Sequence, residues 1–181
     1  MVDPSDGDLV RRAHEGDVSA VGQLYDRHHE RIFRYVWSRV SDSHLAEDLT
    51  GEVFTRMVIS LPEYRPTAVP FRAWLYRIAH NLVVDHYRKE SHHASVPLYH
   101  AESQSGEAEN PASIVERQIT VERVHRALDR LDPSQREVVV LRFLVGLSLR
   151  EVALTLGRSI AAIKSLQHRG LAALRAALKQ V

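Results

Sequence analysis

The side chains best suited to recognition chemistry lie on a predicted helix near the C-terminus. Ser159 is well placed to begin this helix, and Ile163 and Leu166 mark its apolar side. The other side has small residues at its start and polar or basic residues further on. Such a face suits a helix whose first half enters a DNA major groove and whose flank contacts phosphates. The predicted DNA-contacting residues are Ser159, Ala161, Ala162, Lys164, Ser165, His168 and Arg169.

The segment before this helix completes a helix-turn-helix pattern. Ser148 and Glu151 have the spacing of a capping box, which predicts a helix start. Ala153 is small enough for a second helix to cross closely, and Gly157 permits a left-handed turn between the two helices. The apolar residues expected to fix the crossing are Val152, Leu156, Ile163 and Leu166. The alternative that these residues leave open is a plain helical hairpin with a solvated basic face.

The formal net charge of +1 conceals a strong segregation of charge along the chain. Residues 1–90 carry 12 basic and 14 acidic side chains, and residues 91–116 carry 4 acidic side chains and no Lys or Arg. Residues 117–181 carry 12 basic and 5 acidic side chains, a net charge of +7, and residues 64–89 have a net charge of +4. Two separated basic regions predict a polyanion that contacts the protein in two places.

Several other classes of chemistry are not supported by the sequence. The chain has no Cys, which excludes disulfide scaffolds, thiol nucleophiles and Cys-ligated metal centres. The 11 His residues form no recognisable metal-ligand spacing, and His86 beside Asp85 has neither a nucleophile nor a phosphate loop near it in sequence. We therefore expect a non-enzymatic protein with no metal and no cofactor. The N-terminus lacks the pattern of a signal peptide, and no apolar run approaches about 18 residues, so we expect a cytoplasmic protein without membrane insertion.

Apolar periodicity predicts an all-α fold of two small helical domains, an N-terminal helical bundle and a C-terminal helix-turn-helix domain. Gly and Pro lie mostly at the expected helix boundaries, and Asp132 followed by Pro133 is a strong start signal for a helix that Gly146 is expected to end. Asp17 and Ser43 are expected to cap the second and third helices. The predicted domains are residues 1–90 and residues 115–181, joined by a flexible acidic linker at residues 91–114. The predicted helices cover residues 9–15, 17–36, 43–61, 71–89, 113–131, 133–146, 148–156 and 159–177.

Two sequence blocks resemble a known family. The first consists of AEDLTGEVFTRMV and FRAWLYRIAHNLVVDHYRK, which resemble the N-terminal domain of bacterial sigma factors. The second is LDRLDPSQREVVVLRFLVGLSLREVALTLGRSIAAIKSLQHRGLAALRAAL, which resembles their C-terminal promoter-binding domain. The order and spacing of the blocks are similar to those of the extracytoplasmic-function (ECF) group, which keeps only these two domains. The resemblance covers about residues 9–90 and 115–180.

The resemblance implies core RNA polymerase as a partner, through the clamp helices of its largest subunit and the flap of its second-largest subunit. The segment similar to the clamp-binding helix is residues 46–58, and the matching residues are Asp48, Leu49 and Glu52. Two acidic residues one turn apart can pair with basic side chains of a partner helix. Gly51 departs from the Gln common in the family at this position. The alternative for Asp48 and Glu52 is a solvated face.

The resemblance also implies that the helix at residues 71–89 and the Pro-rich stretch at residues 62–70 melt and recognise the promoter −10 element. Asn81 matches the position from which ECF factors hydrogen-bond a flipped base, and an amide can both donate and accept. Trp74 is expected in the core. The residues expected at the −10 element are Tyr64, Arg65, Arg77, Asn81, Asp85, Arg88 and Lys89.

For the −35 element, the resemblance implies recognition by the C-terminal helix described first. Many members have Arg-Leu where this chain has Leu166-Gln167, so Lys164, His168 and Arg169 are expected to carry more of the recognition. The function implied is that of a sigma factor controlled by an anti-sigma factor. Two alternatives stay open: an autonomous helix-turn-helix regulator that binds duplex DNA as a dimer, and a pure protein-interaction module.

Overall fold

The computed structural model describes residues 3–40, 42–66, 69–92 and 123–180, which belong to two compact units. These residues contain helices and no strand, in agreement with the predicted all-α fold. The first elements are α1 (Asp6–His14), α2 (Val18–Val40), α3 (Ser43–Ser60), the 3-10 turn η1 (Leu61–Glu63) and α4 (Phe71–His92). After residue 122 come a helical stretch at residues 123–129, α6 (Pro133–Val139), the π-helical turn η2 (Val140–Leu144), α7 (Leu149–Leu156) and α8 (Ile160–Leu178).

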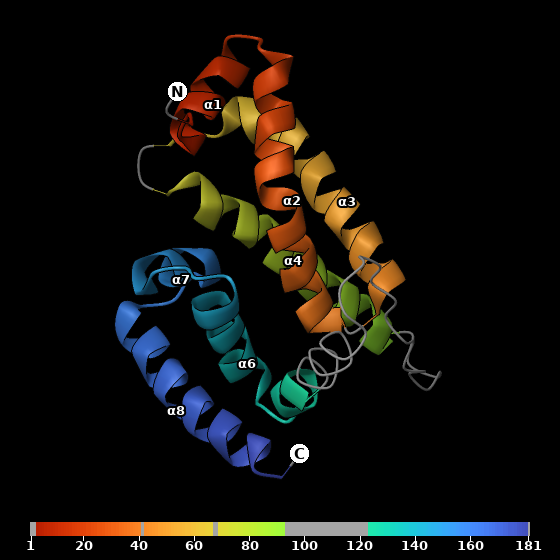
Figure 1. The fold of residues 1–181 in the computed structure, drawn as a ribbon, viewed down its shortest axis with the longest axis vertical. Helices are drawn as coiled ribbons and strands as arrows, with labels where there is room; N and C mark the ends of the chain where they lie inside the picture. Colours follow the sequence, from red (N-terminus) through yellow and green to blue (C-terminus); the bar gives the residue numbers. More distant parts are fainter. Residues whose placement is uncertain (1–2, 41, 67–68, 93–122, 181) are drawn as a thin grey trace, which may run out of the picture. The chain divides into compact units, whose positions relative to one another are not determined.

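The first unit is a bundle in which α2, α3 and α4 pack against one another and α1 packs on α2 (Figure 1). The aromatic rings of Tyr35 on α2 and Tyr76 on α4 lie edge to face, 5.3 Å apart, at the centre of this core. Burial raises the pKa of Tyr76 to about 12. Met57 on α3 and Leu24 on α2 are fully buried as well. This packing fixes which face of α4 points outward.

Side-chain caps set the helix starts and correct two predictions. The first helix begins at Asp6 rather than Leu9, because Ser5 and Asp8 form a capping box. The third helix is capped by Asp42, whose Oδ1 accepts a hydrogen bond from the Leu45 N–H at 2.9 Å, and not by Ser43. The prediction that Asp17 caps the second helix is confirmed, since its Oδ1 accepts from the Ser19 N–H at 2.9 Å.

The predicted start of α6 is confirmed. Asp132 accepts a hydrogen bond from the Ser134 N–H, and Pro133 occupies the first turn. The end differs from the prediction: α-helical bonding stops at Val139, and a π-helical turn continues to Leu144. Gly146 then adopts a φ of +77°, as expected of the glycine that ends this helix.

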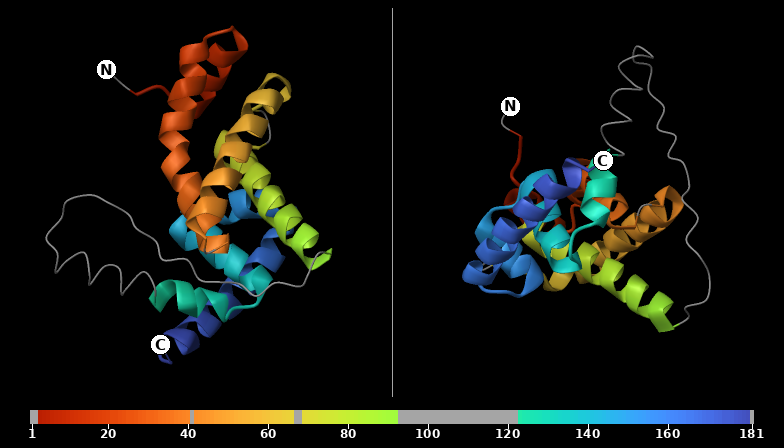
Figure 2. Two further views of the ribbon diagram at one scale, coloured as in Figure 1. Left: turned by 90° about the vertical axis from the view of Figure 1, so that its right-hand side faces the viewer. Right: turned by 90° about the horizontal axis from the view of Figure 1, so that it is seen from below.

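Helix α8 lies alongside α6 in the second unit (Figures 1 and 2). The two helices approach closely at Gly170, where a Cβ atom would lie 2.8 Å from Val139 Cγ2. The predicted capping box of α7 is confirmed: the Ser148 N–H donates to Glu151 Oε2 at 2.7 Å, and the Glu151 N–H donates to Ser148 Oγ at 3.1 Å. Gly157 has a φ of +62° in the turn between α7 and α8.

Some predictions fall partly outside the described residues. Most of the predicted linker at residues 91–114 does so, although residues 91–92 are the end of α4, which is longer than predicted. The helix predicted over residues 113–131 is described only from residue 123, where residues 123–129 are helical. Within the described ranges, no helix is long and apolar enough to cross a membrane.

Candidate protein and nucleic-acid interfaces

Helix α3 presents the predicted polymerase-binding residues on its outer side. Val53 and Met57 are buried on the inner side, whereas Asp48 and Glu52 are exposed and Leu49 is half-buried at the boundary. Glu52 Oε1 accepts a 2.8 Å hydrogen bond from Arg56 Nε, one turn further along the helix. The structure therefore brings two carboxylates and an apolar edge together on one surface of α3.

Gly51 lies between these two carboxylates. A Cβ atom built on Gly51 would meet no atom within 4 Å. The helix surface therefore has no side chain, and open space around it, at the position where the family commonly has Gln.

Helix α4 has one buried side and one polar side. Its buried side includes Leu75, Ala79 and Leu82. On its polar side, the Arg88 guanidinium lies 3.6 Å from the Asp85 carboxylate, one turn away. The spacing places the predicted −10 residues of this helix on one face: Arg77, Asn81, Arg88 and Lys89 are exposed, and Asp85 is half-buried.

The segment that leads into α4 is held by aromatic packing. The ring of Tyr64 lies 4.6 Å from that of half-buried Trp74 and 5.9 Å from that of Phe71. The Tyr64 hydroxyl donates to the Val69 carbonyl oxygen at 2.7 Å, and only 6% of the residue is exposed. Tyr64 therefore contributes its ring to the packing beneath this segment, and its contact with DNA stays a prediction.

Arg65 is exposed beside Tyr64. Its guanidinium donates to the Pro62 carbonyl oxygen at 2.7 Å and to the Tyr64 carbonyl oxygen at 3.2 Å. The positive charge of Arg65 is thereby fixed at the end of η1, next to the predicted −10 surface.

The outer face of α8 carries the predicted −35 residues. Ser159 caps the helix, with its Oγ accepting from the Ala162 N–H at 3.2 Å, and Ile163 and Leu166 are buried on the inner face. Leu156, predicted in the same apolar wedge, is only half-buried. The exposed residues of the outer face are Ser159, Ala161, Lys164, Ser165, His168 and Arg169, with Ala162 half-buried beside them.

Arg142 is a structural residue of this region that the sequence analysis missed. From η2 it donates through Nε to Gln167 Oε1 on α8 at 3.0 Å, and through Nη1 to the Leu147 carbonyl oxygen. Gln167 is thus engaged inside the protein rather than turned toward a ligand. No local pattern marks this contact, because it joins residues 25 apart in the sequence.

The described residues offer no metal site. Within them, no group of three or more His, Asp or Glu side chains lies close enough together to hold an ion. The described polar surfaces instead consist of exposed cations, amides, hydroxyls and carboxylates on single helix faces, an arrangement suited to binding other macromolecules.

Comparison with known protein families defines the class of protein to which this chain belongs. The family model for Sigma-70 region 2 matches residues 24–93, and that for Sigma-70, region 4 matches residues 127–176. The first match contains α3 and α4, and the second contains α6, α7 and most of α8. These are two regions of bacterial RNA polymerase sigma factors, in the order that the sequence resemblance predicted.

Individual relatives narrow the class further. The chain is 34% identical to the ECF RNA polymerase sigma factor ShbA of Streptomyces griseus, over 96% of this chain and 95% of that protein. It is 36% identical to the ECF RNA polymerase sigma factor BldN of Streptomyces coelicolor, over 91% of this chain but only 62% of the length of BldN. The solved structure of CnrH, in complex with the cytosolic domain of CnrY, has a TM-score of 0.73 at 30% identity and covers 95% of this chain and 96% of that one. The chain belongs to the family of ECF RNA polymerase sigma factors.

Proposed function

We propose that this protein directs core RNA polymerase to a specific set of promoters and assists the opening of their DNA. In this proposal, residues 1–90 bind core polymerase and the −10 element, residues 115–181 bind the −35 element, and residues 91–114 join the two domains. The chain acts in the cytoplasm by binding, and the polymerase performs the chemistry.

The observation that carries the proposal is a pair of exposed polar faces on helices whose opposite sides are buried. On α4 this face includes Arg77, Asn81 and Arg88, and on α8 it includes Lys164 and His168. A helix with this asymmetry can lie against DNA without exposing its apolar side. An autonomous helix-turn-helix regulator would account for α8 but would leave the face of α4 without a role.

Binding to polymerase is assigned to two surfaces. Asp48, Leu49 and Glu52 on α3 are proposed to contact the clamp helices of the largest subunit, because carboxylates one turn apart can pair with basic residues of a partner helix. The C-terminal domain is proposed to contact the flap of the second-largest subunit. We also propose control by an anti-sigma factor, in keeping with the complex formed by the related CnrH.

The deciding experiment is run-off transcription by purified core polymerase and this chain on a library of random promoters. We expect the pool to become enriched in sequences that share two elements with a fixed spacing. The chain alone should bind the selected duplexes weakly. Failure to program initiation, together with tight binding of duplex DNA by a dimer of the chain alone, would favour the autonomous regulator instead.

Variants in the two candidate DNA faces give a sharper test. We expect Asn81→Ala to reduce base preference at one −10 position by roughly 5- to 150-fold, the typical effect of losing one specific base contact. Lys164→Ala should weaken use of the −35 element and leave −10 preference unchanged. Matched controls are Arg34→Ala on α2 and Arg175→Ala near the end of α8, both of which remove exposed charges outside the proposed surfaces. Unchanged promoter preference in both Asn81→Ala and Lys164→Ala would contradict these site assignments.

A further inference from the structure

Helix α1 precedes the part of the chain that matches the region 2 model, which begins at residue 24. It nevertheless contacts η1, at one end of the segment that connects η1 to α4, and reaches the start of α4, at the other end, through His28 of α2. This segment contains Arg65 and leads directly into the helix that carries Asn81. The two contacts involve different residues of α1 and can be disrupted separately.

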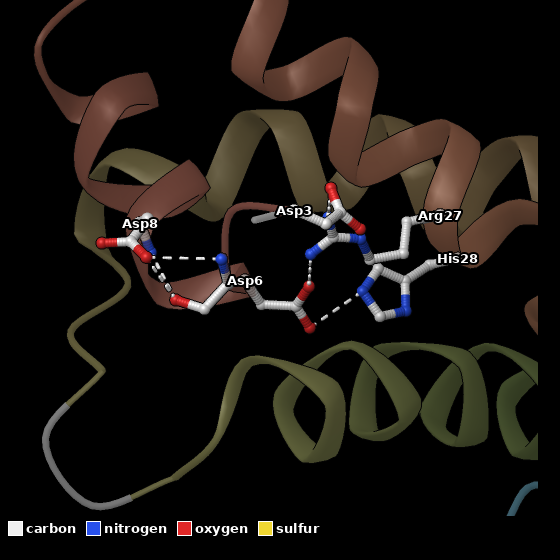
Figure 3. Close-up of polar contacts among 6 residues, drawn as sticks. Asp3, Asp6, Asp8, Arg27 and His28 are labelled. Carbon is white, nitrogen blue, oxygen red and sulfur yellow. Dashed lines mark hydrogen bonds and ion pairs between the residues drawn. The ribbon is translucent and has the colours of Figure 1, made fainter. Parts of the chain in front are cut away.

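The first contact is made by Asp6, the first residue of α1. Its Oδ2 lies 3.0 Å from His28 Nε2, and its Oδ1 accepts a 2.8 Å hydrogen bond from Arg27 Nη1, both from α2 (Figure 3). His28 is 2% exposed, and its ring packs against that of Phe71, with the centroids 5.5 Å apart. Phe71 is the first residue of α4. Asp6 therefore supports the beginning of α4 through one intervening side chain.

The electrostatics of this contact agree with its geometry. Partial burial alone would raise the pKa of Asp6, but the hydrogen bonds from His28 and Arg27 and their positive charges outweigh it and hold this pKa below its usual value. Because a carboxylate only accepts hydrogen bonds, Nε2 of His28 must carry a proton. Burial and the nearby negative charge of Asp6 together raise the pKa of Tyr64, so the charge of Asp6 acts within the segment itself.

The second contact is made by His14, the last residue of α1. Its Nε2 lies 2.8 Å from the carbonyl oxygen of Leu61, the first residue of η1. A carbonyl oxygen is an acceptor, so His14 donates this hydrogen bond. His14 also lines a hollow together with Leu61, Pro62 and Arg65. The opposite end of α1 thus holds the other end of the segment.

Contacts inside the segment connect its two anchored ends. The Tyr64 hydroxyl donates to the Val69 carbonyl oxygen, and the Tyr64 ring packs at a tilt against that of Trp74 in the first turn of α4. Arg65 donates to the Pro62 carbonyl oxygen, within η1. A displacement of η1 or of the start of α4 would therefore change the position of Arg65 relative to the polar face of α4.

We propose that α1 is a positioning element for −10 recognition, in which Asp6 and His14 anchor the two ends of the segment between η1 and α4. The ligand affected is the single-stranded DNA of the −10 element, so this inference rests on the proposed function. Asp6 and His14 are positioning residues that act through His28, Phe71 and Leu61 and do not contact the DNA. Base discrimination requires the side chains that contact the bases to be held in a fixed position, and the two anchors are proposed to do this.

The test is the same promoter-library selection with core polymerase, performed on full-length variants. Asp6→Ala removes the first anchor and His14→Ala removes the second. His14→Gln retains an N–H donor that can reach the Leu61 carbonyl oxygen. Arg11→Ala is the matched control, because Arg11 is an exposed residue of α1 that pairs with Asp8 of the same helix. The readout is the enrichment of preferred bases at the −10 positions relative to that at the −35 positions of the same pool.

We expect Asp6→Ala and His14→Ala to lower the enrichment of preferred bases at the −10 positions at least about threefold, because a displaced base contact loses part of its discrimination. The enrichment at the −35 positions should not change. His14→Gln and Arg11→Ala should resemble the wild type. Unchanged −10 enrichment in both alanine variants would overturn the inference. An equal loss at both elements would also overturn it, because that result indicates only a smaller amount of folded protein.

The outcomes separate this inference from the proposed function. If wild-type protein selects no promoters, the proposed function fails. If wild-type protein selects promoters and the α1 variants select them with equal −10 preference, only the positioning role fails. Should Asp6→Ala fail to fold, the comparison of His14→Ala with His14→Gln decides the question alone.

Discussion

Two glycines within helices show how the surroundings of a single residue determine the effect of a substitution. A Cβ atom on Gly51 would meet nothing within 4 Å, whereas one on Gly170 would meet Val139 Cγ2 at 2.8 Å and the Gln135 carbonyl oxygen at 3.2 Å. Val139 is β-branched and has little rotamer freedom in a helix, so it cannot easily yield.

We therefore predict opposite effects of the same substitution at these two glycines. Gly51→Ala should stabilise α3 by about 0.5–1 kcal/mol, because alanine loses less backbone entropy on folding. Gly170→Ala should destabilise the packing of α6 against α8 by about 1–2 kcal/mol, since overpacking outweighs the gain in helix propensity. Amide hydrogen exchange in these helices measures both effects. Equal stabilisation by both substitutions would contradict the close approach at Gly170.

The carboxylate of Asp6 gives the first unit a dependence on pH. Since the pKa of Asp6 is lower in the folded protein than the ordinary value of 3.8, its ionic contacts contribute stability above pH 3.8. This contribution is lost as the pH falls from 3.8 through the lower pKa of the folded state.

We predict that Asp6→Asn is less stable than the wild type at neutral pH and that the difference shrinks as the pH falls below about 3.8. Denaturation followed by the fluorescence of Trp37 and Trp74, both in the first unit, measures the difference at each pH. A difference that stays constant through this range would show that the charge of Asp6 does not contribute.

At the scale of elements, caps fix where the helices begin. Several of these caps were evident in the sequence. Among them are Asp132 before α6 and the capping box formed by Ser148 and Glu151 at the start of α7. Others were misassigned, because Asp42 and Ser43 are adjacent residues with the same capping chemistry. The choice between them depends on how the chain enters α3.

The capping box of α7 gives a prediction for one element. Ser148→Ala should destabilise α7 by about 0.5–2 kcal/mol, because the Glu151 N–H loses its side-chain acceptor. Ser148→Asp should restore most of this loss, since a carboxylate is also a good acceptor at a helix start. Hydrogen exchange of the amides in the first turn of α7 is the measurement. Equal protection in all three proteins would indicate that packing alone holds the helix.

At the scale of the whole molecule, the segregation of charge is expected to set how the proposed binding to promoter DNA depends on salt. The region after residue 116 has a net charge of +7, although the net charge of the chain is only +1. Contacts between cations and phosphates release counterions, so affinity falls as the salt concentration rises. The slope of this dependence reports how many phosphates are contacted.

We predict that the double substitution of Lys164 and Arg169 by Ala lowers the slope of log affinity against log salt concentration by about 2 for the complex with core polymerase. Substitution of Arg175 and Lys179 at the other end of α8 should leave the slope unchanged. The measurement is binding of a selected promoter over a series of salt concentrations. An equal change for both pairs would place the phosphates elsewhere along α8.

The sequence by itself determined the family, the helical class and the polar faces of α4 and α8. These features depend on periodicity and capping, which act over a few neighbouring residues. Only the tertiary structure revealed that the Tyr64 ring is buried and that the two ends of α1 contact η1 and α2. The contacts responsible join His14 to Leu61, 47 residues apart, and Asp6 to His28, 22 residues apart. Partners at such separations are chosen by the packing of helices against one another, which no local pattern encodes.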